Sequence, residues 1–220
     1  MLSFENSIDE SINKKIIALH QAFEKNKFAG CIETVPAYSS LAVFYDLSLL
    51  KKNYGNTVSA YDVVKEFTEK LVSEINPAVG TIKRDTISIP VYYDGEDLEY
   101  LAGQHGLSSE EVILIHSSRT YRVFMIGFLP GFAYMGKVDQ RIATPRMVSP
   151  RTKVRAGSVG IAGFQTGIYP MDSPGGWQLI GQTPLKIFDK HKANPCLLQA
   201  GDQVQFVSIG KDAFESQYEY

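Results

Sequence analysis

Apolar residues in the first third of the chain recur at helical spacing in two stretches and are concentrated in short β-forming runs between them. The first stretch follows a capping-box pattern at Ser7–Glu10, in which a serine and a glutamate three residues later satisfy the first helical amides. The second stretch spans roughly residues 57–75. Between them, residues 31–37 and 41–46 are rich in β-branched and aromatic side chains. This pattern predicts an α+β unit in which two helices cover a small antiparallel sheet.

The rest of the chain shows a different pattern of apolar residues and turns. A strand is expected over residues 86–93, followed by short helices near 95–104 and 108–116. From Tyr121 onward, short strand patterns alternate with glycine and proline turns, which is typical of a β-barrel or sandwich. We therefore expect an α+β protein with two domains, a small one over 1–82 and a β-rich one over 83–220.

Charge and cysteine content exclude several classes of protein. The net charge of −2 gives no general attraction to nucleic acid or to membranes. No apolar run reaches the length of a membrane span, and the acidic N-terminus does not resemble a signal peptide. Cys31 and Cys196 lie far apart without metal-ligand spacing. We expect a cytoplasmic protein with no metal site and no disulfide.

Residues 127–184 carry the most distinctive chemistry. This stretch holds more than half of the 18 glycines and of the 10 prolines, and the single tryptophan, Trp177. It also holds five closely spaced cationic residues: Arg141, Arg146, Arg151, Lys153 and Arg155. Glycines let a ligand approach the backbone, and guanidinium groups fit carboxylates and phosphates. The stretch indicates a preformed anion site, although a solvated loop with scattered salt bridges would have the same composition.

Lys153 and Arg155 stand at alternating positions, so a strand would place them on one side. The glycine-rich run that follows is neither a P-loop nor a dinucleotide-binding loop. Gln165, Thr166 and Tyr169 could give directed hydrogen bonds to a small polar ligand. Tight β-turns explain the same glycines equally well, and the neighbouring aromatic residues could line a pocket or form core.

His116 closes the second short helix of the β-rich region. Its position allows two interpretations. An imidazole there could act as a general acid or base, or it could simply interact favourably with the negative end of the helix dipole.

Several long motifs resemble one known family. They are VPAYSSLAVFYD at 35–46, GFLPGFAYMG at 127–136, the TPR and SPR repeats at 144–151, GSVGIAGFQTGIYP at 157–170, SPGGWQLIGQTP at 173–184 and GDQVQF at 201–206. Together with His116 and Ser117, they are similar to the family known as the B subunit of 5-oxoprolinase, allophanate hydrolase subunit 1 or KipI. The resemblance covers nearly the whole chain. One departure is that only Leu2–Phe4 remains of a strand that usually opens the family's sequences.

The resemblance implies a small α+β domain followed by a cyclophilin-like β-barrel. It also implies a protein that works with a homologous barrel protein, the C-type subunit of 5-oxoprolinase, and with a LamB/YcsF-type subunit to open 5-oxoproline (pyroglutamate) to glutamate using ATP. One branch of the family instead inhibits a sporulation histidine kinase, and an older name points to allophanate or another small amide as substrate. Prolyl isomerase activity would rest on fold analogy alone.

These considerations give a set of expected site residues. For catalysis we expect His116 as the proton-transfer or orienting group and Arg155 as a cation for developing phosphate charge. Around them we expect a binding set: Arg146, Arg151, Gln165, Thr166, Tyr169, Pro130, Gly131, Phe132 and Gly157. ATP is expected to bind with the partner subunit, since no nucleotide motif is present here.

Overall fold

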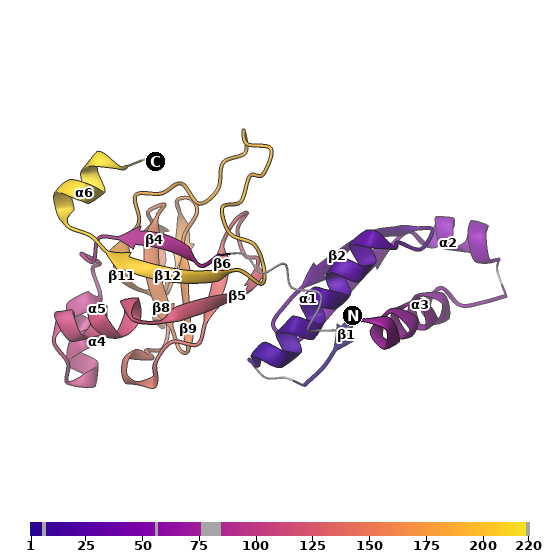
Figure 1. Ribbon diagram of the computed structural model, residues 1–220, viewed down its shortest axis with the longest axis horizontal. Helices are drawn as coiled ribbons and strands as arrows, with labels where there is room; N and C mark the ends of the chain where they lie inside the picture. The colour runs from indigo at the N-terminus through magenta and orange to yellow at the C-terminus, as the bar shows by residue number, and fades with distance from the viewer. Residues whose placement is uncertain (6–7, 56, 76–84, 219–220) are drawn as a thin grey trace. The chain divides into compact units, whose positions relative to one another are not determined.

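The computed structural model describes residues 1–5, 8–55, 57–75 and 85–218. Contacts divide the chain into two units, Met1–Lys83 and Arg84–Tyr220 (Figure 1). Both combine helices and strands, which confirms the expected α+β class. The expected boundary between residues 82 and 83 falls within 76–84, outside the described residues, and stays a prediction.

The first unit is built on a three-stranded antiparallel sheet with the strand order β1-β3-β2. Its elements, in chain order, are β1 (Leu2–Ser3), α1 (Glu10–Lys25), β2 (Cys31–Pro36), β3 (Ser40–Tyr45), α2 (Leu47–Tyr54) and α3 (Ala60–Glu74). Apolar faces of α1 and α3 meet in one core with Leu41 of β3 and Leu50 of α2. The short β1 pairs with β3 and forms one edge of this sheet.

Capping explains where the helices of this unit begin. The carboxylate of Asp9 accepts hydrogen bonds from the amides of Ser11 and Ile12, so α1 starts after Asp9. Ser7, the expected cap, lies outside the described residues. The pattern of apolar residues did not predict α2, although Asp46 caps it in the same way as Asp9 caps α1.

The second unit contains a seven-stranded sheet with the order β11-β8-β9-β6-β5-β12-β4. A bridge between Tyr92, just after β4, and Gln182, at the end of β11, joins the two edges through paired backbone hydrogen bonds of 2.9 Å. The sheet is therefore a nearly closed barrel, as expected. Its strands are β4 (Ile87–Val91), β5 (Thr120–Ile126), β6 (Ala133–Gly136), β8 (Ser158–Ala162), β9 (Gln165–Ile168), β11 (Gln178–Gln182) and β12 (Gln203–Ser208).

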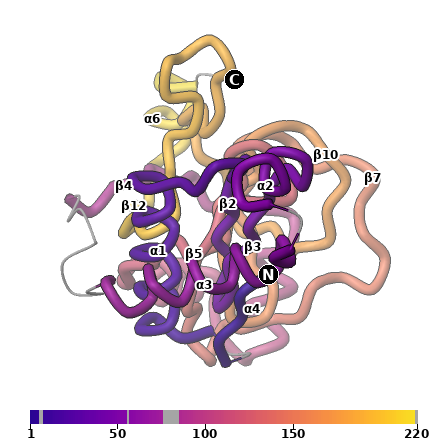
Figure 2. The backbone as a smooth tube through the Cα atoms, turned by 90° about the vertical axis from the view of Figure 1, so that its right-hand side faces the viewer, coloured from indigo at the N-terminus to yellow at the C-terminus, as the bar shows by residue number. Residues whose placement is uncertain are grey.

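The second unit also contains two short strands and several short helices outside the seven-stranded sheet. A separate pair of strands, β7 (Arg151–Val154) and β10 (Ser173–Gly175), lies beside it (Figure 2). The remaining elements are α4 (Leu98–His105), α5 (Ser109–Ser117), a 3-10 turn η1 (Gln140–Ile142) and α6 (Lys211–Ser216). The predicted capping box at Ser108 and Glu111 is present at α5, whereas the sequence pattern did not predict α6.

The barrel core is a continuous apolar cluster contributed by inward-facing strand residues and by α4 and α5. Across the described residues, no helix combines the length and hydropathy that a membrane span requires.

Candidate functional site

A pocket of about 480 Å³ opens beside the edge at which the barrel closes. Its walls come from the connection between β4 and α4, from β7 and the segment that leads to β8, from β11, and from α6. The polar and charged side chains that line it are Tyr92, Asp94, Glu96, Lys153, Arg155, Ser158, Gln182, Lys211 and Glu215. This mixture of cations, acids and hydrogen-bonding groups suits a small polar ligand.

The wall formed by residues 92–97 is fixed against β11. The amide of Asp97 donates a 2.9 Å hydrogen bond to the carbonyl of Leu179, and the Asp97 carboxylate accepts one of 2.6 Å from the Leu179 amide. Gly95 lies so close to this strand that a Cβ there would overlap the Leu179 backbone. The conformation of this wall is therefore set by backbone contacts before any ligand arrives.

Arg151 belongs to the support of that wall. Its guanidinium donates to the Asp97 carboxylate at 2.6 Å, to Glu96 at 3.3 Å and to the Trp177 carbonyl at 3.3 Å. The Arg151 and Asp97 side chains are only 16% and 12% exposed. A guanidinium held this way joins β7 to the start of α4, so its donors are occupied within the protein.

Lys153 and Arg155 both line the pocket, Lys153 from β7 and Arg155 from the residue that follows this strand. Lys153 is paired with Asp172 at 2.8 Å, and this hydrogen bond is the main reason that the pKa of Asp172 lies below its usual range. The Arg155 guanidinium adds a weaker electrostatic effect on Asp172 but makes no hydrogen bond or ion pair with another described residue. Of the cations expected to act together, Arg155 is thus the one that lines the pocket with its donors available.

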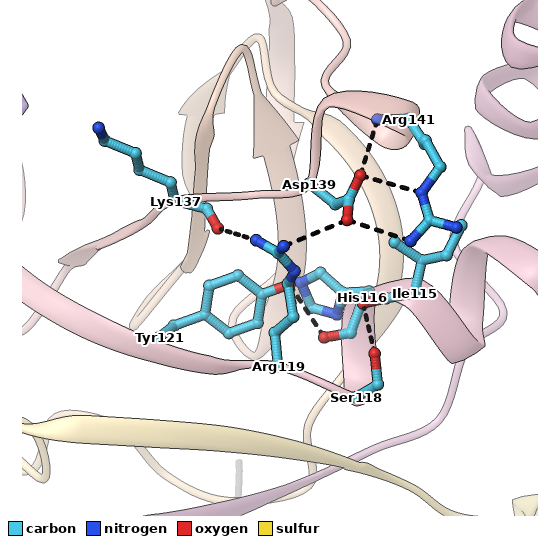
Figure 3. Close-up of polar contacts among 8 residues, drawn as sticks. All are labelled: Ile115, His116, Ser118, Arg119, Tyr121, Lys137, Asp139 and Arg141. Atoms are coloured by element: carbon cyan, nitrogen blue, oxygen red, sulfur yellow. Dashed lines mark hydrogen bonds and ion pairs between the residues drawn. The ribbon is translucent and has the colours of Figure 1, made fainter.

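The other two cations of the cluster lie elsewhere. Arg141 forms a two-pronged interaction with Asp139, which Arg119 also contacts at 3.3 Å (Figure 3). Hydrogen bonds from Arg141 lower the pKa of Asp139 to about 2. Arg146 is exposed and is not among the residues that line the pocket.

His116 is completely buried in the barrel. Its ring stacks on Phe206 with 4.6 Å between centroids, and Tyr121 donates a hydrogen bond to its backbone carbonyl (Figure 3). Burial lowers the pKa of His116 to about 3, so the ring is neutral at physiological pH. In this structure the imidazole has no face toward solvent or toward the pocket.

Both ring nitrogens of His116 have partners, and their roles can be assigned. Thr166 has one hydroxyl proton and lies 3.0 Å from the Gly160 carbonyl, which can only accept. The Nε2 of His116, 2.9 Å from Thr166 Oγ1, must then be the donor in that contact. Nδ1 is left to accept from the Tyr93 hydroxyl at 2.8 Å. The hydrogen bonds therefore run in series from Tyr93 through His116 and Thr166 to the Gly160 carbonyl. This arrangement favours a role for His116 in holding Tyr93 and Thr166 in place over proton transfer to a substrate.

The other expected binding residues do not gather at the pocket either. Phe132 and Tyr169 are almost completely buried and pack edge to face at 5.2 Å in a cluster with Tyr134 and Trp177. Gly131 and Gly157 are buried and adopt positive φ, which explains why glycine occupies both positions. Thr166 is buried, Gln165 is half-buried and Pro130 is exposed. The expected contacts of these residues with a ligand stay predictions.

Sequence reasoning missed the walls at residues 94–96 and at α6. Asp94, Lys211 and Phe214 line the pocket, but they belong to no glycine-rich or basic motif. Phe214 is the only aromatic residue of α6, and its ring lies 5.7 Å from that of Tyr92. An apolar residue in a polar helix after the last strand was the available signal. Within the described parts of the chain, no cluster of His, Cys, Asp and Glu has the arrangement of a metal site.

Comparisons with known proteins extend this picture. Residues 1–198 match the family described as Carboxyltransferase domain, subdomain C and D. The chain is 44% identical over 220 residues to the B subunit of 5-oxoprolinase from Bacillus subtilis, covering 98% of this chain and 91% of the relative. It is 43% identical over 182 residues to the protein of the same name from Haemophilus influenzae, covering 81% of this chain and 80% of the relative.

Solved structures show the same architecture. The structure of TTHA0988 superposes with a TM-score of 0.82 at 35% identity, covering 95% of this chain and 40% of that one, so this chain corresponds to less than half of TTHA0988. The uncharacterized protein PH0987 from Pyrococcus horikoshii is 45% identical, with a TM-score of 0.58 and coverage of 97% and 94%. The K. lactis urea amidolyase shares the fold at 21% identity and a TM-score of 0.72; this chain is covered over 96% of its length and spans 14% of that protein.

Proposed function

This chain belongs to the family that contains the B subunit of 5-oxoprolinase and the carboxyltransferase subdomains C and D, and we propose that it is a subunit of an ATP-dependent enzyme that opens 5-oxoproline to glutamate. Relatives at 43% and 44% identity are named as that component of 5-oxoprolinase. The observation that carries the proposal is the pocket into which Arg155 brings a guanidinium without a bonded partner among the described residues.

The chemistry of the substrate matches the pocket. 5-Oxoproline carries one carboxylate beside a lactam, and a guanidinium can bind a carboxylate through two parallel hydrogen bonds. Lys153 and Lys211 add positive charge along the same walls. In this proposal Arg155 holds the substrate carboxylate instead of the developing phosphate charge expected from the sequence. The two lysines, each paired with a carboxylate of the protein, add a weaker stabilisation of the negative charge that develops as the ring is opened.

Activation of the lactam needs a further component. An unstrained amide resists attack by water, and phosphorylation of the lactam oxygen by ATP gives the carbon a better leaving group. The chain has no P-loop or dinucleotide motif, so we place ATP with partner subunits: a homologous barrel protein and a LamB/YcsF-type protein. The cytoplasmic location of such an ATP-dependent complex is part of the same proposal.

Reconstitution tests this function. The chain is combined with the two proposed partners, and ATP-dependent release of glutamate from 5-oxoproline is measured with this chain present and omitted. Activity that requires the chain is the expected result. Equal activity without it would contradict the proposal.

The alternative function, inhibition of a histidine kinase, needs an exposed apolar patch on the barrel, and the aromatic residues Phe132 and Tyr134 of the GFAYMG motif are the candidates for it. Phe132 is buried and Tyr134 is half-buried, so these two side chains do not form such a patch. Phe128 and Phe164 are exposed instead, but no observation on the described residues indicates a protein that would bind them.

A further inference from the structure

Most of the charged side chains that line the pocket form ion pairs within the protein. Lys153 is paired with Asp172, Glu96 with Arg151, and Lys211 with Glu215 at 3.8 Å. Two charged groups are left over. They are the guanidinium of Arg155 and the carboxylate of Asp94, neither of which has a hydrogen-bonded or ion-paired partner among residues that the structure describes.

Asp94 is held in place although its carboxylate is unused. Its amide donates a 3.2 Å hydrogen bond to the Tyr92 carbonyl. On one side, Tyr92 is paired with Gln182 across the barrel seam, and on the other, Gly95 packs against β11. The side chain of Asp94 is exposed, but the backbone that carries it is fixed on both sides, so this backbone loses little conformational freedom when the carboxylate binds a ligand.

We propose that Asp94 recognises the nitrogen of the substrate, so that the pocket selects ligands that combine a carboxylate with an adjacent N–H donor. This inference rests on the proposed function and adds a second recognition group to it. Arg155 binds the carboxylate of 5-oxoproline, and Asp94 accepts the hydrogen bond of the lactam N–H. After ring opening the same carboxylate faces the ammonium group of glutamate.

The pairing of Arg155 with Asp94 explains why a carboxylate without a protein partner belongs in a pocket for an anion. A second cation at this position would bind any small carboxylate, whereas an acceptor rejects ligands that lack a donor beside their carboxylate. A binding site built around a hydrogen bond discriminates strongly against analogues that cannot make it, because its own polar group is then left unpaired.

A pair of ligands isolates this contact. Calorimetric titration of the full chain compares 5-oxoproline with its ring-oxygen analogue, 5-oxotetrahydrofuran-2-carboxylate, which keeps the carboxylate and lacks the N–H. The wild-type protein is expected to bind 5-oxoproline roughly ten- to a hundred-fold more tightly than the analogue, the range for a hydrogen bond to a charged group. Asp94→Ala should remove most of that preference, and Asp94→Asn, which keeps a neutral acceptor, should retain part of it.

Two further variants make the comparison specific. Arg155→Ala should weaken both ligands alike while the preference between them persists. Asp85→Asn removes an exposed carboxylate outside the pocket lining and should change neither affinity. Fluorescence of Trp177 checks that each variant keeps a folded barrel.

The outcomes separate this inference from the function beneath it. Equal affinity of the wild type for both ligands, or a preference that survives Asp94→Ala, would overturn the role of Asp94 while leaving Arg155 and the pocket in place. Failure of the wild type to bind either ligand at millimolar concentration would overturn both the assignment of Asp94 and the pocket as the substrate site.

Discussion

The interior around His116 and the pocket around Arg155 make an instructive comparison, because the sequence singles out both residues as candidates for catalysis. In the interior, every polar atom of the imidazole is used: Tyr93 and Thr166 occupy its two nitrogens, and Phe206 covers its ring. In the pocket, Arg155 and Asp94 have charges without bonded partners among the described residues. The chemical type of a residue therefore does not mark a site; the availability of its polar atoms does.

The largest expected effect on stability is a difference between two arginines that lie four positions apart, Arg151 and Arg155. Arg151→Ala leaves the mostly buried Asp97 carboxylate without its cation, and breaking such a pair costs about 3–5 kcal/mol of unfolding free energy. Arg155→Ala removes an exposed side chain without a bonded partner and should change that free energy by about 0.5 kcal/mol or less. Urea unfolding followed by the fluorescence of Trp177, which lies in the barrel unit, measures both. Equal losses for the two variants would show that Arg151 is not a structural clamp.

The second effect concerns the protonation of His116. Its pKa is about 3 in the folded protein and near 6.5 when unfolded, so the unfolded chain binds more protons between these values. The contribution of neutral His116 to the unfolding free energy is fully present well above pH 6.5. It decreases as the pH falls and is lower by about 2 kcal/mol at pH 5.

The variant His116→Gln tests that dependence. It removes the titrating group, so the unfolding free energy of the barrel should become flatter between pH 7 and pH 5, whatever its absolute value. Trp177 fluorescence again reports on the barrel rather than on the first unit, which contains His20. An unchanged slope would mean that protonation of His116 does not accompany unfolding.

The smallest expected effect lies at the edge of the pocket. Phe214→Ala removes the ring that contacts Tyr92 and should cost the barrel about 1 kcal/mol or less, because α6 has no buried residue. The affinity for 5-oxoproline should fall a few-fold, since Phe214 lines the pocket. Calorimetry measures the affinity for 5-oxoproline, and urea unfolding measures the loss of unfolding free energy. A stability loss as large as that of Arg151→Ala would place Phe214 in the fold rather than in the pocket wall.

Periodicity predicted the elements that carry strong local patterns. Helical spacing located α1 and α3, whose apolar faces are buried, and the capping box located α5. The barrel strands were located by short runs between glycine and proline turns, because strands such as β8 and β11 are buried on both faces and do not alternate. The helices α2 and α6 were missed because each is short and carries little of the core: Leu50 is the buried residue of α2, and α6 has none.

The site was predicted only in part, for a different reason. Lys153 and Arg155 line the same pocket, but Arg155 lies just after β7 rather than in it, so strand alternation alone does not fix that relation. The role of Arg151 depended on Asp97, more than fifty positions away, and nothing local reports such a pairing. Asp94 lines the pocket because the two edges of the sheet meet at Tyr92 and Gln182. That meeting is a property of the barrel and is not encoded in any local motif.

The most direct test of the account is the steady-state kinetics of the reconstituted enzyme carrying Arg155→Ala, with Lys190→Ala as a control that removes an exposed charge outside the pocket. If Arg155 binds the substrate carboxylate, kcat/KM for 5-oxoproline should fall roughly ten- to a hundred-fold in the Arg155 variant alone, while Trp177 fluorescence shows an unchanged unfolding midpoint. Wild-type kinetics for Arg155→Ala would contradict the assignment of this pocket as the substrate site.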